Sequence, residues 1–163
     1  MVIRRCYPAP APRRAGTQRE LRMAELNLKL QVDCFSPAAV RVLIAEDFPP
    51  FRQFVCSMLA GKSDLRIIEE VSDGVEAVQK PAELKPDLIL LDIGLPTMNG
   101  IEAARRIRAL VPVSKIIFLS QESSADVIEE ALNTGARGYV VKAQAASQLL
   151  AAIDAAISNA VPR

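Results

Sequence analysis

Short apolar runs alternate with longer amphipathic stretches from residue 41 onward. The apolar runs are rich in Ile, Leu and Val, and the stretches between them repeat their apolar residues with a helical spacing. The runs predict strands at 41–46, 65–71, 87–92, 115–120 and 138–141. The stretches predict helices at 49–61, 72–84, 99–110, 124–136 and 145–158.

The predicted strands are continuously apolar instead of alternating with polar residues, which indicates that both faces of each strand are buried. Strand and helix alternate five times along the chain. Because right-handed crossovers place helices on both sides of a parallel sheet, this order predicts a doubly wound α/β fold. We expect a five-stranded parallel sheet covered by five helices.

Proline and glycine mark several helix boundaries. Pro50 suits the first turn of helix 49–61, and Gly61 suits its end. Pro81 lies inside the predicted helix 72–84, which it should break or kink because it has no amide hydrogen. Two apolar stripes are expected on helices, one formed by Phe51, Phe54, Val55, Met58 and Leu59 and the other by Ile101, Ala104, Ile107 and Leu110.

The two ends of the chain differ in composition from the region between them. Residues 1–20 are rich in Pro, Arg and Ala without a period, and residues 20–32 could form a short amphipathic segment. We expect residues 1–39 to form a basic, Pro-rich, disordered extension. We therefore place one domain at residues 40–159 and a short tail at residues 160–163. Met1 and Met23 are both candidates for the start of translation.

Composition excludes several classes of function. The chain has no histidine, which removes Ser-His-Asp triads and histidine-ligated metal sites. Its three cysteines lie far apart and form no CxxC pair, so we expect free thiols in the cytoplasm. No apolar run approaches the roughly 20 residues of a membrane helix, and the N-terminus does not resemble a signal peptide.

The net charge of +1 argues neither for nor against nucleic acid as a partner, but it is unevenly distributed. Residues 1–40 carry seven Lys and Arg against three Asp and Glu, a net charge of +4. Residues 41–163 carry thirteen against sixteen, a net charge of −3. The predicted domain is therefore mildly acidic.

An acid interrupts the most apolar run of the chain, at Asp92 in the stretch DLILLDIGLPTMNG. Burying an unpaired carboxylate is costly, so its position needs an explanation. Other predicted strands also end in polar residues, namely Glu46 and Asp47, Ser120, and Lys142. Because ligands bind beyond the carboxyl ends of parallel strands, we expect these side chains to meet at one edge of the sheet.

Three converging carboxylates repel one another unless a cation lies between them, and oxygen ligands favour Mg²⁺. Lys142 adds a positive charge and Ser120 a hydroxyl donor. Together they face Asp92, and this arrangement suits a phosphoryl group. An aspartate can act as a nucleophile through an aspartyl phosphate, with positioning and charge neutralisation doing most of the catalysis.

These features resemble a response-regulator receiver domain of two-component signalling. The matching stretches are LIAED, LLDIGLPTMNG, IIFLS and GARGYVVK. The last stretch is most similar to receivers of the NarL/FixJ type, which usually carry a helix-turn-helix output domain. The resemblance implies a flavodoxin-like (CheY-like) fold with strand order 2-1-3-4-5.

The resemblance implies a role for each polar strand end. Asp92 would be the phosphoacceptor. Asp47 would bind Mg²⁺ directly, Glu46 mainly through water, and Gly94 through its backbone carbonyl. Pro96 and Gly100 would shape the loop that follows the acceptor.

The remaining implied roles concern the phosphoryl oxygens and the switch. Ser120 and Lys142 would bind the phosphoryl oxygens. Ser120 would move toward the phosphoryl group and vacate space that Tyr139 fills, and we expect both residues at the ends of neighbouring strands. Gly94 and Glu122 occupy positions where receivers vary the residues that tune phosphoryl lifetime.

One position departs from the family pattern. Many receivers have a proline after the lysine, often across a cis bond, whereas here Ala143 follows Lys142. A cis bond before a residue other than proline costs about 2.5–4 kcal/mol, so we expect a trans bond and a slightly different placement of Lys142. Receivers of the NarL/FixJ type often lack this proline.

The resemblance also implies partners. A sensor histidine kinase or a phosphotransfer protein would donate the phosphoryl group, because a chain without histidine cannot be the donor. We expect a signalling switch and not an enzyme, with chemistry limited to self-phosphorylation and slow autodephosphorylation. A downstream protein or a second copy would bind through the fourth helix, fifth strand and fifth helix. Neither direct DNA binding nor membrane binding is expected.

Three alternative functions differ in what they require of the sequence. A phosphatase of the haloacid dehalogenase kind would carry its aspartate nucleophile in a DxDx(T/V) pattern at the first strand. Here the candidate nucleophile Asp92 lies on the third predicted strand, and its stretch DIG lacks the second aspartate. A binding-only pseudo-receiver would not need the complete set of acids. The third alternative is the receiver fragment of a longer helix-turn-helix regulator, because too few residues follow the last predicted helix to form a helix-turn-helix domain.

Overall fold

The computed structural model describes residues 39–158. The predicted extension at residues 1–39, apart from Ala39, and the predicted tail at residues 160–163 lie outside this range. Both predictions therefore remain predictions. Cys6 and Cys34 also lie outside the described residues, so their expected free-thiol state stays a prediction, whereas Cys56 is a half-buried free thiol.

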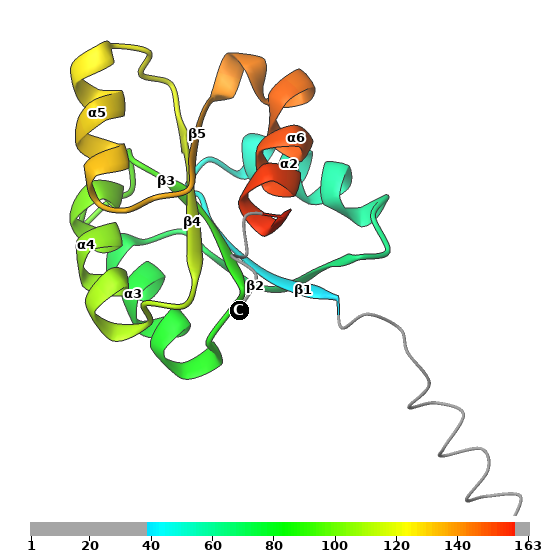
Figure 1. The fold of residues 1–163 in the computed structure, drawn as a ribbon, viewed down its shortest axis with the longest axis horizontal. Helices are drawn as coiled ribbons and strands as arrows, with labels where there is room; N and C mark the ends of the chain where they lie inside the picture. Colours follow the sequence, from blue (N-terminus) through cyan, green and yellow to red (C-terminus); the bar gives the residue numbers. More distant parts are fainter. Residues whose placement is uncertain (1–38, 159–163) are drawn as a thin grey trace, which may run out of the picture. The chain divides into compact units, whose positions relative to one another are not determined.

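Five strands and five α-helices alternate along the described part of the chain (Figure 1). The strands are β1 (Val40–Ala45), β2 (Leu65–Val71), β3 (Leu88–Asp92), β4 (Lys115–Ser120) and β5 (Gly138–Val141). The helices are α2 (Pro49–Ala60), α3 (Gly74–Leu84), α4 (Gly100–Leu110), α5 (Ala125–Asn133) and α6 (Ala145–Ser158), with a short 3₁₀ helix, η1 (Lys142–Gln144), before α6. Each predicted element is confirmed, and the boundaries differ by at most three residues.

The five strands form one sheet in the order β2-β1-β3-β4-β5, and every neighbouring pair is parallel. The doubly wound fold and the strand order are thereby confirmed. Helices α2 and α6 cover one face of the sheet, and α3, α4 and α5 cover the other (Figure 1). All strands therefore point their carboxyl ends to the same edge.

Alternate residues of the central strands enter two separate cores. In β3, Ile89 and Leu91 belong to the core beneath α3, α4 and α5. Leu88 and Leu90 belong to the core beneath α2 and α6. All four side chains are fully buried, which explains why this strand is continuously apolar.

Pro81 does not break its helix, which continues from Gly74 to Leu84. The predicted break is therefore wrong, whereas a kink at Pro81 stays a prediction. The proline lies near the end of the helix and its side chain is buried. The helix ends shortly afterwards at Lys85, which adopts a left-handed conformation with φ of 48°. Pro81 lacks the amide that would donate to the Ala77 carbonyl, and burial of its ring offsets part of that cost.

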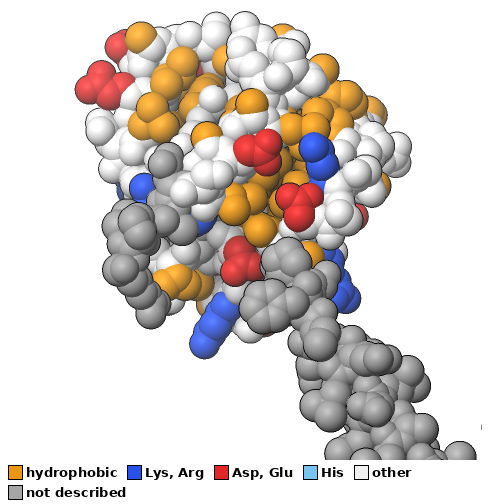
Figure 2. Space-filling view, turned by 45° about the vertical axis from the view of Figure 1, so that its right-hand side comes forward, with side chains coloured by type: hydrophobic (Ala, Val, Ile, Leu, Met, Phe, Trp, Pro, Cys, Tyr) orange, Lys and Arg blue, Asp and Glu red, His pale blue; other side chains and the backbone are white. Residues whose placement is uncertain are grey.

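The two predicted apolar stripes are only partly buried. Val55 and Leu59 are buried, as are Ile101 and Ile107, but Phe54 is 37% exposed and Leu110 is 59% exposed. Figure 2 likewise shows hydrophobic side chains reaching the surface in several places among scattered charged groups. None of the helices within residues 39–158 has both the length and the apolar character needed to cross a bilayer.

Candidate functional site

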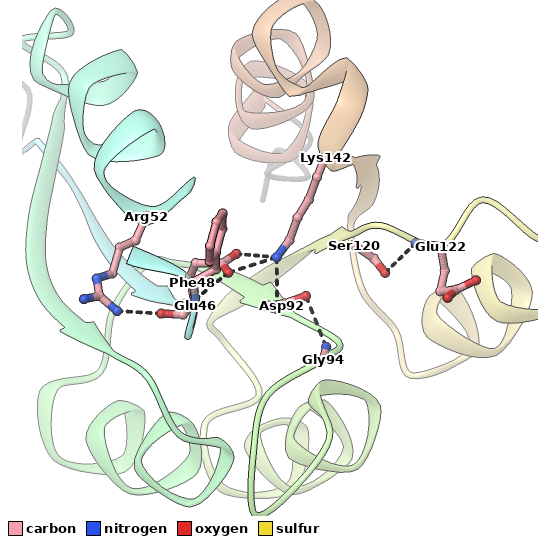
Figure 3. A network of polar contacts seen from close by, with 8 residues as sticks. All are labelled: Glu46, Phe48, Arg52, Asp92, Gly94, Ser120, Glu122 and Lys142. Atoms are coloured by element: carbon pink, nitrogen blue, oxygen red, sulfur yellow. Dashed lines mark hydrogen bonds and ion pairs between the residues drawn. The ribbon is translucent and has the colours of Figure 1, made fainter. Parts of the chain in front are cut away.

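The polar residues that end the strands converge at one edge of the sheet (Figure 3). Asp92 and Ser120 are the last residues of β3 and β4, while Glu46 follows β1 and Lys142 follows β5. A cavity of about 480 Å³ opens beside them. It is lined by Asp47, Phe48, Asp92, Ile93, Gly94, Ser120, Gln121, Glu122 and Lys142.

Lys142 joins two of the carboxylates. Its Nζ donates hydrogen bonds of 2.9 Å to Glu46 Oε1 and of 2.9 Å to Asp92 Oδ2. Glu46 Oε2 also lies 2.8 Å from Nζ as an ion pair. The Lys142–Ala143 bond is trans, as expected, because no peptide bond among the described residues is cis.

Glu46 is completely buried and incompletely paired. Its Oε1 accepts a 3.1 Å hydrogen bond from the Phe48 amide, whereas its Oε2 has the ion pair but no hydrogen bond. Burial raises the pKa of Glu46, although hydrogen bonding to Lys142 opposes this effect. Burial lowers the pKa of Lys142, but hydrogen bonds to Glu46 and Asp92 outweigh it and keep the pKa above the ordinary value. The lysine therefore stays an ammonium ion.

Asp92 is oriented by groups on both sides. Its Oδ1 accepts a 3.1 Å hydrogen bond from the Gly94 amide, and its Oδ2 accepts the bond from Lys142 (Figure 3). The residue is only 4% exposed, yet it lines the cavity. The acid at the end of an apolar strand is thus paired and faces a space large enough for a ligand.

Three carboxylates are placed so that one cation could contact all of them. Oxygen atoms of Glu46, Asp47 and Asp92 lie within 4.8 Å of one another. Asp47 is exposed, while the other two are buried. A hard divalent cation takes oxygen ligands of this kind, and the buried Oε2 atom of Glu46 without a hydrogen bond is consistent with such an ion.

The loop after Asp92 packs so tightly that it requires glycine. A Cβ atom on Gly100 would lie 2.1 Å from the Asp92 carbonyl oxygen, and one on Gly74 would lie 1.8 Å from the Met98 carbonyl oxygen. The Gly74 amide donates a 3.1 Å hydrogen bond to Pro96 O. Helix α3 therefore supports the loop that follows Asp92.

Two side chains that support this loop were missed by the sequence analysis. Thr97, with φ of 68°, donates a hydrogen bond to Asp73 Oδ2. Asp73 also accepts bonds of 2.7 and 3.3 Å from the Val75 and Glu76 amides at the start of α3. These contacts lower the pKa of Asp73, the Thr97 hydrogen bond most strongly. The Asp-Gly pair before a helix was the available signal for this cap.

Arg52 supports the acidic end of β1 and was also missed. Its Nη1 donates a 2.7 Å hydrogen bond to the Glu46 carbonyl, and its Nε lies 3.3 Å from Glu70 Oε2. The arginine therefore ties the backbone beside Glu46 to strand β2. A single arginine in an amphipathic helix carries no sequence signal for such a role.

Ser120 and Tyr139 lie at different levels of the sheet, which corrects the expectation that both end their strands. Tyr139 lies opposite Phe118, and Val141 lies opposite Ser120. The two residues are connected through Glu122, whose amide donates a 3.1 Å hydrogen bond to Ser120 Oγ. Its carbonyl accepts a 2.9 Å bond from the Tyr139 hydroxyl.

Comparisons with known proteins agree with this geometry. The family described as "Response regulator receiver domain" matches residues 42–154. Chemotaxis protein CheY of Listeria monocytogenes is 33% identical over 117 residues, which cover 72% of this chain and 98% of CheY. The receiver domain of Thermotoga maritima CheB has a TM-score of 0.68 and 32% identity, covering 74% of this chain and 97% of that domain.

Longer regulators match as well. Transcriptional regulatory protein PdtaR of Mycobacterium tuberculosis is 39% identical over 119 residues, which cover 73% of this chain and 57% of PdtaR. Response regulator protein VraR of Staphylococcus saprophyticus is 32% identical over 120 residues, covering 74% of this chain and 57% of VraR. The chain thus spans a little over half the length of these two relatives. The family match, the identity to several regulators and the five-stranded parallel fold together show that the chain belongs to the response-regulator receiver family of two-component signalling.

Proposed function

We propose that Asp92 accepts a phosphoryl group from a phosphohistidine of a sensor histidine kinase or phosphotransfer protein, and that this phosphorylation activates the receiver. The observation that carries the proposal is the orientation of the Asp92 carboxylate at the cavity. One oxygen is held by the Gly94 amide and the other by Lys142, at 3.1 and 2.9 Å.

The transfer is a displacement at phosphorus. A carboxylate oxygen of Asp92 forms the new P–O bond while the P–N bond to the donor imidazole breaks. The imidazole leaves with the electron pair of that bond and takes up a proton from solvent. The product is an acyl phosphate, which water hydrolyses slowly to restore the carboxylate.

We assign Mg²⁺ to the acidic cluster, as receiver domains bind this ion at an acidic site. Asp47, Asp92 and the Gly94 carbonyl would hold the ion directly, and Glu46 mainly through water. Bound Mg²⁺ would neutralise charge on the phosphoryl oxygens. Lys142 adds its ammonium and Ser120 its hydroxyl to the same oxygens.

The switch would act through Glu122. When Ser120 turns toward the phosphoryl group, its Oγ can no longer accept the hydrogen bond from the Glu122 amide. The Tyr139 hydroxyl, which donates to the Glu122 carbonyl, would then be released from its partner. The surface formed by α5, β5 and α6 would change, and a downstream protein or a second copy would bind there.

The test is phosphorylation of the full chain with acetyl phosphate and Mg²⁺, followed by intact-mass spectrometry. We expect one added phosphoryl group on the wild type and none on Asp92→Asn. Asp154→Asn, an exposed carboxylate on α6, is the control and should be labelled as the wild type is. Undiminished labelling of Asp92→Asn would contradict the assignment, and an unlabelled wild type would favour a binding-only pseudo-receiver.

A further inference from the structure

The ammonium group of Lys142 has an aromatic neighbour in addition to its carboxylate partners. Its Nζ lies over the ring of Phe51, 4.9 Å from the ring centroid. A cation within about 6 Å of an aromatic face is attracted by the quadrupole of the ring. Phe51 therefore adds an uncharged contact from helix α2 to a lysine that follows strand β5.

Phe51 is itself held in place. Its half-buried side chain packs against the core between the sheet and helices α2 and α6. Its ring centroid lies 5.8 Å from that of Phe54. The ring thus presents a fixed surface, whereas the lysine side chain is a flexible four-carbon stem that ends in a point charge.

The ring contact differs from the carboxylate contacts in one respect. Phosphorylation would convert the Asp92 carboxylate into an acyl phosphate, and a bound cation would change the charge around Glu46. The Phe51 face has no ionisable group and keeps its attraction for the ammonium in every state of the site. It can therefore hold Lys142 beside Asp92 while the other partners of the lysine change.

We propose that Phe51 is a positioning residue for phosphoryl acceptance, whose ring face holds the Lys142 ammonium beside Asp92. The inference rests on the proposed function of Asp92 and Lys142. Phe51 does not line the cavity, so it acts through the lysine and not through the phosphoryl group. Loss of the ring frees the ammonium to sample other positions, and fewer encounters with the donor then find it in place.

The test compares aromatic and aliphatic residues at this position in the full chain. The initial rate of phosphorylation by acetyl phosphate at saturating Mg²⁺ is measured by intact-mass spectrometry for Phe51→Leu, Phe51→Met and Phe51→Tyr. We expect rates roughly 3- to 30-fold below wild type for the two aliphatic variants, from the strength of a cation–π contact. Phe51→Tyr should remain within about twofold of wild type because it keeps the ring face.

Met58→Leu is the matched control, since Met58 lies on the same helix and packs against the same core as Phe51, and the substitution should leave the rate unchanged. Circular dichroism checks that each variant is folded, and the two aliphatic variants serve in place of each other if one does not fold. Equal rates for the aliphatic variants and Phe51→Tyr, whether all high or all low, would overturn the inference. A wild type that accepts no phosphoryl group would instead refute the proposed function.

Discussion

Replacing Lys142 with methionine removes the charge between two buried carboxylates and keeps an apolar stem of similar length. In the wild type, Lys142 Nζ lies 2.8 Å from Glu46 Oε2 and 2.9 Å from Asp92 Oδ2. The Glu46 side chain is 0% exposed and the Asp92 side chain is 6% exposed. Breaking a buried ion pair costs about 3–5 kcal/mol, because the remaining charge is left without compensation. Since Asp92 faces a cavity that water can enter, we expect a loss of about 2–4 kcal/mol in the free energy of unfolding at pH 7.

The loss should become smaller on acidification. Burial raises the pKa of Glu46 above its ordinary value of 4.5, and Lys142 opposes that shift. Without the ammonium the pKa should rise further. An acid whose pKa is raised in the folded state binds its proton more tightly there, so the folded state gains stability as pH falls through that pKa. The variant should therefore recover part of its deficit between pH 7 and about pH 5.

Urea unfolding followed by circular dichroism at both pH values measures this effect. Lys80→Met is the control, because Lys80 Nζ lies 3.5 Å from Glu83 in an exposed pair that contributes less than about 1 kcal/mol. Added Mg²⁺ should also reduce the deficit, since a cation that binds the folded state replaces the lost charge. A loss below about 1 kcal/mol at pH 7, or an equal loss at both pH values, would refute the reasoning.

Three further predictions follow from the packing, the switch and the charge. Gly100→Ala should lower the free energy of unfolding, measured by urea titration, by about 1–3 kcal/mol, because the added Cβ would lie 2.1 Å from the Asp92 carbonyl oxygen. Gly61→Ala is the control and should change the free energy of unfolding little, because the nearest atom to its added Cβ is 3.9 Å away. NMR spectra with and without beryllofluoride and Mg²⁺ should show shifts around Tyr139, and unchanged signals there would contradict the proposed switch. A chain that starts at Ala39 should show no sequence-specific binding to labelled duplex DNA in fluorescence anisotropy at near-physiological salt. The reason is its acidic charge, since residues 41–163 have thirteen Lys and Arg against sixteen Asp and Glu. Sequence-specific binding that phosphorylation enhances would overturn this expectation.

The candidate site was largely predictable because it depends on the direction of the strands. Residues that follow buried parallel strands must meet at one edge, whatever the details of packing. Asp92, Ser120 and Lys142 could therefore be grouped before any distance was known. The assignment of a phosphoryl group, in contrast, came from the resemblance to receiver domains together with the chemistry of these side chains.

Positions that depend on register or on the placement of helices were not predictable. Tyr139 lies two residues before Val141, the β5 residue that pairs with Ser120, and only the pairing of β4 with β5 decides this. The contact between Phe51 and Lys142 joins residues 91 positions apart in the chain. The bond from Thr97 to Asp73 likewise requires α3 to lie against the loop after β3.

By itself the sequence determined the order and type of the elements, the parallel sheet and the edge at which the polar residues gather. These features follow from local patterns, because continuous apolar runs need burial on both faces and helices repeat their apolar residues. The tertiary structure decided which residues of the apolar stripes stay exposed, and Leu110 is one of them. It also decided that the helix containing Pro81 continues and which groups hold Lys142 and Asp92. Such contacts form between side chains distant in sequence, so their geometry depends on how whole elements pack and not on the pattern within any one of them.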